Sequence, residues 1–228
     1  MKCRWHIYPS SEELYKKAAL GVARIANESA NRGGVFRVVV CGGQTPKPLY
    51  RRLAAMEIEW HAWQVYFTDE RCLPADHTER NSHLLHECLL DHVAIPSVQV
   101  HAIPAELGPE EGAAAYQRML SDTNYFDLVV LGLGEDGHVA SLFPGRDIWK
   151  DASATPVLAV YNSPKPPPER VTLSAERLSK SRNIMCLAIG ASKRRALSDW
   201  ITGYPLPVCS IHGMDGIDMF VDQDAWPV

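Results

Sequence analysis

The residue with the clearest chemical potential is His138, which lies in a short polar segment directly after an apolar run. That run extends from Leu128 to Leu133 and breaks into Gly134-Glu135-Asp136-Gly137-His138. An apolar stretch of roughly four to eight residues that ends at glycines indicates a strand buried on both faces of a sheet. Open α/β sheets bind their ligands at the carboxyl ends of such strands. The sequence therefore predicts that His138 lies at a ligand site.

A glycine-rich turn is a candidate site for an anion. Gly42-Gly43-Gln44-Thr45 follows the β-branched segment Val35–Cys41 and precedes Pro46, which suits the first position of a helix with Thr45 as its N-cap. Glycines let a backbone approach a ligand closely, and the amino end of a helix presents unpaired N–H groups. A tight turn that binds nothing would have the same residues, so the two interpretations are equally supported at this point.

Charged side chains follow two further expected strands. Asp69-Glu70-Arg71 comes after Val65–Thr68, and Lys165 and Arg170 lie in the proline-rich segment that begins at Asn162. Each charge alone is more typical of a solvated surface, although a guanidinium suits bidentate contacts to phosphate. Two glycine-rich turns, two basic loops and one histidine at strand ends together indicate a site for a small phosphorylated molecule.

Expected strands and helices alternate along almost the whole chain. Ser10 and Glu13 form a capping box before the first helix, and Gly33-Gly34 ends that helix. Such alternation predicts parallel pairing with right-handed crossovers. We expect one domain over residues 1–228, an α/β fold with a Rossmann-like, open, mainly parallel sheet and helices on both faces. The expected strands are 3–8, 35–41, 65–68, 98–103, 128–133, 157–161, 184–189 and 217–221, and the expected helices begin near residues 10, 46, 81, 109, 172–174 and 192.

The composition excludes several classes of protein. The 228 residues carry a formal net charge of −4, without the basic excess typical of nucleic-acid-binding proteins. The segment Met1–Tyr8 lacks the apolar core of a signal peptide, and no apolar run is long enough to span a membrane. The six cysteines are irregularly spaced, and several, such as Cys41 and Cys186, lie in apolar runs. This pattern favours reduced thiols in a cytoplasmic protein with no nucleic-acid or membrane partner.

Two motifs suggest a cofactor or a metal, and neither is convincing. Gly132-x-Gly134-x-x-Gly137 formally matches a dinucleotide fingerprint, but Pro144-Gly145 interrupts the crossover helix that this fingerprint requires. A second group of residues has the side chains of a zinc site without its tight paired spacings, and it consists of Cys72, His77, His83, His86 and Cys88. We therefore expect neither a cofactor nor a metal.

Four segments of the chain resemble those of the 6-phosphogluconolactonases, within a wider group that includes the glucosamine-6-phosphate deaminases. The segments are Gly42–Pro46 with Leu49-Tyr50, Asp69-Glu70-Arg71 with Pro74 and Asn81, Phe126–Gly145, and Ser163–Arg170. They occur in the order found in that family and together span most of the chain. The fold that this resemblance implies is the α/β sheet already expected.

The resemblance also implies roles for individual residues. Gly42, Gly43, Gln44 and Thr45 are expected to hold a sugar phosphate, Arg71, Lys165 and Arg170 to be substrate-binding cations, His138 to be catalytic, and Asp69 to be an active-site aspartate. Gln44 stands where the family often has serine, which removes a hydroxyl contact but leaves the backbone contacts. Glu135 and Val139 replace the more usual Pro and Thr beside the histidine.

The implied reaction is hydrolysis of 6-phospho-D-glucono-1,5-lactone to 6-phosphogluconate in the oxidative pentose phosphate pathway. An imidazole with an ordinary pKa of about 6.5 is largely neutral near pH 7, so it is able to accept a proton from water. His138 would activate water, while Asp69 would orient His138, the water or a sugar hydroxyl. The expected partner is the small sugar-phosphate lactone alone, bound by a monomer.

Two other functions compete with this hypothesis. A glucosamine-6-phosphate deaminase usually has Tyr at the position of Arg71 and a glutamate shortly after its histidine, whereas no acid lies between His138 and Asp147 here. A non-catalytic sugar-phosphate sensor would keep the phosphate-binding groups but would have no need of His138.

Overall fold

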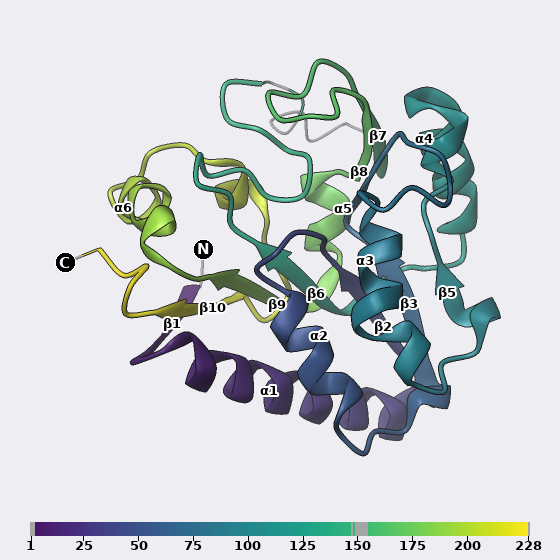
Figure 1. Ribbon diagram of the computed structural model, residues 1–228, viewed down its shortest axis with the longest axis horizontal. Coiled ribbons are helices and arrows are strands. Elements are labelled where there is room, and N and C mark those ends of the chain that lie inside the picture. Colours follow the sequence, from purple (N-terminus) through teal and green to yellow (C-terminus); the bar gives the residue numbers. More distant parts are fainter. Residues whose placement is uncertain (1–2, 147, 149–154, 228) are drawn as a thin grey trace.

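The computed structural model describes residues 3–146, 148 and 155–227 and is built on a seven-stranded sheet (Figure 1). The strand order is β1-β10-β9-β6-β2-β3-β5, and each pair of neighbours is parallel. The expected mainly parallel α/β sheet is therefore confirmed. The strands are β1 (Cys3–Tyr8), β2 (Phe36–Val40), β3 (Trp63–Phe67), β5 (Val100–His101), β6 (Phe126–Gly132), β9 (Ser181–Ala188) and β10 (Ile217–Asp222).

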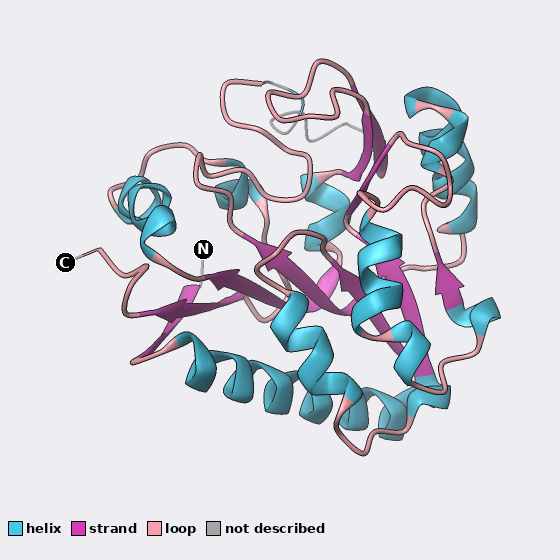
Figure 2. Ribbon diagram, viewed as in Figure 1, coloured by secondary structure: helices cyan, strands magenta, loops and turns pink. Residues whose placement is uncertain are grey.

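Helices cover both faces of this sheet (Figure 2). They are α1 (Ser11–Gly33), α2 (Lys47–Ala54), α3 (Asn81–Cys88), α4 (Pro109–Met119), α5 (Ala175–Ser179) and α6 (Arg194–Ile201). In Figure 1, α1 and α2 lie on one side of the sheet, and α5 and α6 lie on the other. Short 3-10 turns occupy Trp60–Ala62, Leu90–His92, Ser97–Gln99, Ala105–Leu107, Ala191–Lys193 and Pro207–Ser210.

The central strands are buried on both faces, as their uninterrupted apolar runs predict. Val38, Val39, Leu128 and Val129 are each at most 1% exposed. Within the described residues no helix is long and apolar enough to cross a membrane. All six cysteines are free thiols.

A second, three-stranded sheet corrects the expectation of a single sheet. Strand β4 (Asp69–Arg71) pairs antiparallel with β8 (Arg170–Leu173), and β8 pairs antiparallel with β7 (Val157–Val160). Asp69–Arg71 was expected to be a loop and Thr172 a possible start of a helix. Both are strand residues because their backbones pair with each other across about one hundred positions, which local sequence patterns do not reveal.

Two helices begin within one residue of their predicted starts, but the caps that the sequence suggests for them, Thr45 and Asn81, are wrong. Helix α2 begins at Lys47 after Pro46 and has no side-chain cap; the backbone carbonyl of Thr45 accepts a hydrogen bond from the Tyr15 hydroxyl. Asn81 is the first residue of α3 and is not its cap, because its side-chain amide donates to the carbonyl oxygen of Asp69. Ser10 and Gly34 do cap α1 as predicted.

Glu70 replaces the expected cap of α3. Its fully buried carboxylate accepts hydrogen bonds from the amides of Asn81 (2.7 Å) and Ser82 (2.8 Å). The same carboxylate lies 3.5 Å from the Nε of Arg80, which is itself buried. A negative charge at the amino end of a helix satisfies its unpaired donors and complements its dipole. Glu70 therefore attaches α3 to the small sheet.

The first prediction concerns the contribution of this carboxylate to stability. Glu70→Gln leaves Arg80 and two helix amides with a neutral partner, so we expect the free energy of unfolding to fall by about 3 kcal/mol. Glu87→Gln, at an exposed position of the same helix, should change it by less than about 0.5 kcal/mol. Urea unfolding followed by circular dichroism measures both. Equal effects of the two substitutions would contradict this role of Glu70.

Candidate active site

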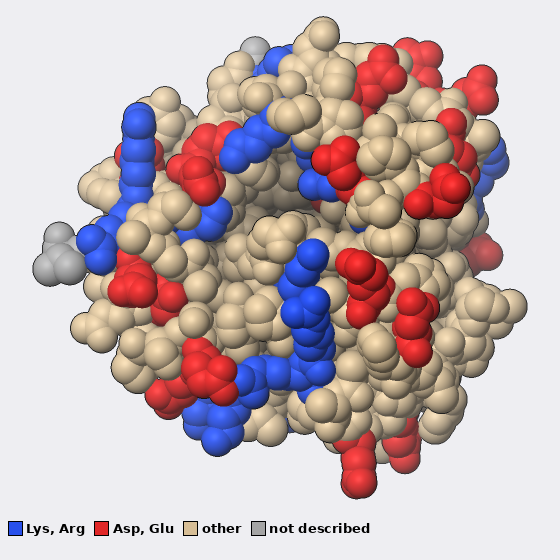
Figure 3. Space-filling model, in the orientation of Figure 1, with Lys and Arg blue, Asp and Glu red and all other residues tan. Residues whose placement is uncertain are grey.

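A cavity of about 300 Å³ opens at the carboxyl ends of β2 and β6, beside the small sheet. Figure 3 shows the hollow, with positive and negative side chains on its rim. The site residues expected from the sequence all line it, namely Gly42, Gly43, Gln44, Thr45, Asp69, Arg71, His138, Lys165 and Arg170. The tertiary structure therefore brings together residues that are separated by more than one hundred positions.

The glycine turn lines this cavity with backbone groups. Within the described residues, the amides of positions 42–45 donate no hydrogen bond, so they are available to a ligand. Gly43 has a φ of +94°, which favours glycine. A Cβ on Gly42 would lie 1.8 Å from the Asn81 Oδ1, so only glycine fits there. Successive unpaired amides before a helix form a concave site for an anion.

His138 is held by a neighbouring carboxylate that the sequence reasoning missed. Its Nδ1 lies 2.5 Å from the Oδ1 of Asp136. The two side chains fold back over Gly134, where a Cβ would lie 2.1 Å from the same Nδ1. The Asp-x-His spacing within a glycine turn was the available signal. A carboxylate on Nδ1 fixes the imidazole and directs its Nε2 lone pair toward a reactant.

Asp136 stays ionised because of its neighbours. Partial burial raises the pKa of this carboxyl group, but the hydrogen bond and positive charge of His138, together with the Lys165 ammonium, outweigh burial. The net result is a pKa well below the ordinary value of a carboxyl group. Asp136 is therefore an acceptor for an imidazole N–H.

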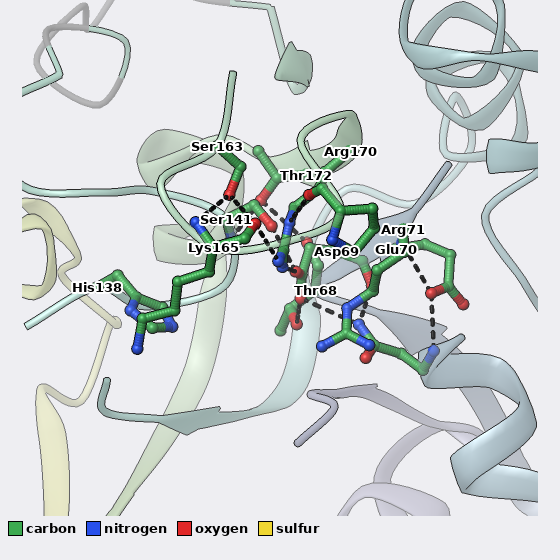
Figure 4. Close-up of polar contacts among 12 residues, drawn as sticks. Thr68, Asp69, Glu70, Arg71, His138, Ser141, Ser163, Lys165, Arg170 and Thr172 are labelled. Atoms are coloured by element: carbon green, nitrogen blue, oxygen red, sulfur yellow. Dashed lines mark hydrogen bonds and ion pairs between the residues drawn. The ribbon is translucent and has the colours of Figure 1, made fainter. Parts of the chain in front are cut away.

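Asp69 lies in a separate network (Figure 4). Its carboxylate accepts hydrogen bonds from the hydroxyls of Ser141 (2.6 Å) and Thr68 (2.9 Å), and the Nη1 of Arg170 is 3.9 Å away. Asp136, not Asp69, is thus the carboxylate in contact with His138. Of the partners predicted for Asp69, water and a sugar hydroxyl of the substrate remain. Through Ser141 it also attaches the loop after His138 to β4.

The cations of the cavity differ in how many of their hydrogen-bond donors already have partners within the protein. Arg170 is buried and donates to the carbonyls of Lys165 (3.0 Å), Pro166 (2.9 Å) and Pro167 (3.2 Å), so most of its donors hold the proline-rich loop. Lys165, carried by that loop, extends toward His138 in Figure 4. Arg71 donates through Nη1 to the carbonyl of Glu79, and its buried Nε has no hydrogen-bond partner in the part of the chain that the structure describes.

Lys193 is a fourth cation in the cavity and was not predicted. It follows β9 as the glycine turn follows β2 and His138 follows β6, so the same reasoning applied to the segment after Ile189 would have found it. Burial lowers the pKa of its ammonium group, and the carboxylate of Glu135 opposes that effect. Among residues 3–146, 148 and 155–227, no group of three or more His, Cys, Asp and Glu side chains is placed to hold a metal ion.

The second prediction concerns the coupling of Asp136 to His138. His138→Gln removes the imidazole, whose hydrogen bond and charge lower the pKa of Asp136 most, so that pKa should rise. The backbone N–H of residue 138 and the Lys165 ammonium still oppose the effect of burial. Titration of the side-chain carboxyl by ¹³C NMR in wild type and variant measures the shift. His86→Gln, at an exposed histidine paired with Asp91, should leave Asp136 unchanged. A wild-type Asp136 that titrates at the ordinary 3.8 would contradict the pairing.

Comparisons of the sequence with a family model and with known proteins agree on one family. Residues 9–218 match the family model of glucosamine-6-phosphate isomerases/6-phosphogluconolactonase. The chain is 32% identical over 243 residues to 6-phosphogluconolactonase 3, chloroplastic, of Arabidopsis thaliana. The aligned region covers 98% of this chain and 74% of that protein. The chain is 34% identical over 205 residues to 6-phosphogluconolactonase of Mycobacterium leprae, which covers 82% of this chain and 83% of the relative.

Solved structures give the same result. The crystal structure of 6-phosphogluconolactonase from Thermotoga maritima has a TM-score of 0.90 at 28% identity and covers 97% of this chain and 100% of its own. The enzyme of the same name from Trypanosoma brucei has a TM-score of 0.88 at 27% identity, with 98% and 97% covered. The family model spans most of the sequence and the relatives exceed 30% identity over most of their length. The chain therefore belongs to the glucosamine-6-phosphate isomerase/6-phosphogluconolactonase family.

Proposed function

We propose that this protein hydrolyses 6-phospho-D-glucono-1,5-lactone to 6-phosphogluconate, a step of the oxidative pentose phosphate pathway. The observation that carries the proposal is the presence of the Asp136–His138 pair in the same cavity as a turn of unpaired amides. The turn suits a phosphoryl group, and the pair suits activation of water. The names of the relatives at 32–34% identity support the choice of a lactone as the substrate.

The proposed mechanism needs one general base. Asp136 accepts the Nδ1–H of His138, and the Nε2 lone pair takes a proton from a water molecule that attacks C1 of the lactone. The resulting tetrahedral oxyanion is stabilised by a nearby hydrogen-bond donor of the cavity. His138 then returns the proton to the ring oxygen as the C1–O bond breaks, so the imidazole ends neutral. A positioned general base typically contributes roughly 10²- to 10⁴-fold.

The phosphoryl group would be bound by the turn and by the less committed cations. The amides of Gly42, Gly43, Gln44 and Thr45 supply donors, and Arg71, Lys165 and Lys193 supply positive charge. Hydrogen bonds to charged groups contribute about 1.5–3 kcal/mol each, enough to anchor and orient the sugar. Arg170 contributes mainly by shaping the loop that carries Lys165, and its Nη1 is left for Asp69 or a ligand.

One contact in the loop after His138 favours hydrolysis over deamination. Residues 139–146 contain no acidic side chain. The ring of Phe143, which is 2% exposed, packs against the imidazole with centroids 4.8 Å apart. An apolar ring there provides no group to protonate or deprotonate an amine. Ammonia release from glucosamine 6-phosphate would overturn the choice of substrate.

We further propose that the chain acts as one domain and as a monomer in the cytoplasm. A single hydrophobic core includes side chains of both sheets, which supports one domain over residues 1–228. The proposed binding and water-activating groups line one cavity of this chain, so the proposed reaction requires no residue from a second subunit. Six free cysteines fit a reducing compartment.

The third prediction tests the general base. His138→Ala should reduce the enzyme-dependent rate of lactone opening by roughly 10²- to 10⁴-fold. Release of acid from fresh substrate, corrected for spontaneous opening, measures this rate. The matched control is His86→Ala on α3, which should keep wild-type activity. Full activity of the His138 variant would refute its role, and a wild type no faster than water would refute the lactonase itself.

The fourth prediction tests the phosphate contacts. Lys165→Ala should raise KM by roughly 10- to 100-fold, the equivalent of one charge-assisted hydrogen bond, with a smaller effect on kcat. Lys180→Ala, which removes an exposed ammonium paired with Glu176, should leave both constants unchanged. Steady-state kinetics with the phosphorylated lactone provides the measurement. An unchanged KM in the Lys165 variant would remove this residue from the phosphate site.

A further inference from the structure

Two buried tyrosine hydroxyls bond the backbone at the two ends of the glycine turn. Tyr50, in α2, is 1% exposed, and its hydroxyl donates to the carbonyl of Cys41 (2.7 Å) and accepts from the amide of the same residue (3.1 Å). Tyr15, in α1, is 8% exposed, and its hydroxyl donates to the carbonyl of Thr45 (2.7 Å). The turn is thus attached from outside at the residue before it and at its last residue.

The turn needs this external support because it has little of its own. Its four amides are unpaired within the described residues, and two of its residues are glycines. Ordering one residue of a free backbone costs about 1–2 kcal/mol, and glycine costs more than other residues. If the turn were disordered before binding, this ordering cost would reduce the free energy of binding an anion. If the turn is already ordered, binding does not carry that cost.

We propose that Tyr15 and Tyr50 are positioning residues of the phosphate subsite, which hold the turn so that its amides converge on the phosphoryl group. The inference rests on the proposed function, because it takes the turn to be the phosphate site. The Tyr15 hydroxyl contacts the backbone of Thr45, and the Tyr50 hydroxyl contacts the backbone and the Sγ of Cys41, so their effect on the ligand is transmitted through the turn. Both hydroxyls are permanent donors near neutral pH. Burial raises the pKa of Tyr15 to about 12 and raises that of Tyr50 well above its ordinary value.

The chain contains a matched control for the loss of such a hydroxyl. Tyr116, in α4, is fully buried, and its hydroxyl accepts from the amide of Phe67 (3.0 Å) and donates to the carbonyl of the same residue (3.1 Å). Tyr116 makes the same pair of hydrogen bonds to Phe67 that Tyr50 makes to Cys41, but Phe67 ends β3 and leads to Asp69 instead of the glycine turn. Tyr→Phe at each position removes one oxygen atom and keeps the packed ring.

The experiment compares Tyr15→Phe, Tyr50→Phe and Tyr116→Phe with wild type. Isothermal titration with 6-phosphogluconate, and separately with inorganic phosphate, gives the dissociation constants, and thermal unfolding gives the stability of each variant. We expect Tyr15→Phe and Tyr50→Phe to weaken both ligands by roughly 3- to 10-fold, the equivalent of one hydrogen bond, and to raise KM with kcat nearly unchanged. Tyr116→Phe should lose similar stability to Tyr50→Phe but keep the wild-type affinity for phosphate.

Each outcome distinguishes positioning from stabilisation of the fold. If all three variants weaken inorganic phosphate equally, or if none does, the proposal is overturned. A wild type that binds neither ligand overturns it as well. A wild type that binds phosphate through these tyrosines but does not open the lactone would leave the positioning role standing and refute the proposed function alone.

Discussion

Two adjacent buried carboxylates, Asp69 and Glu70, are the interactions on which the arrangement of the site depends. A buried charge is tolerated only when it is paired and hydrogen-bonded, so each carboxylate requires partners from other parts of the chain. Glu70 obtains them from the amino end of α3 and from Arg80. Asp69 obtains them from Ser141, in the loop after His138, and from Arg170 of the small sheet. One strand of three residues therefore connects the main sheet, α3 and the two loops that carry His138 and Lys165.

The cavity separates two electrostatic tasks. The unpaired amides of the glycine turn, with the cations Arg71, Lys165 and Lys193, suit a dianion, and the Lys165 ammonium also acts on Asp136. The second task belongs to the ionised Asp136, which contacts Nδ1 of His138 and so directs Nε2 toward a reactant. Phe143 covers the imidazole with an apolar ring. This division allows the phosphoryl group to orient the sugar at a distance from the carbon that reacts, and it requires no charge in the loop after the histidine.

Much of the fold and most of the site follow from local patterns. The buried run before His138 and the β-branched run before Gly42 predict parallel strands, because only such strands are apolar on both faces. The glycines at their ends predict ligand loops at one edge, and those loops do line one cavity. The small sheet could not be predicted in this way. Asp69–Arg71 is too short and too polar to show a period, and its pairing with Arg170–Leu173 is entirely long-range.

The sequence by itself determined the residue types at the strand ends, and these indicate a phosphorylated ligand and a histidine base. Only the tertiary structure decided which of these side chains contact one another. It assigned Asp136 to His138, because the turn over Gly134 brings their atoms within 2.5 Å, and it placed Asp69 in a structural network. It also added Lys193 to the cavity. The physical reason is that hydrogen bonds and ion pairs depend on distances of a few ångströms, which the order of residues along a chain does not contain.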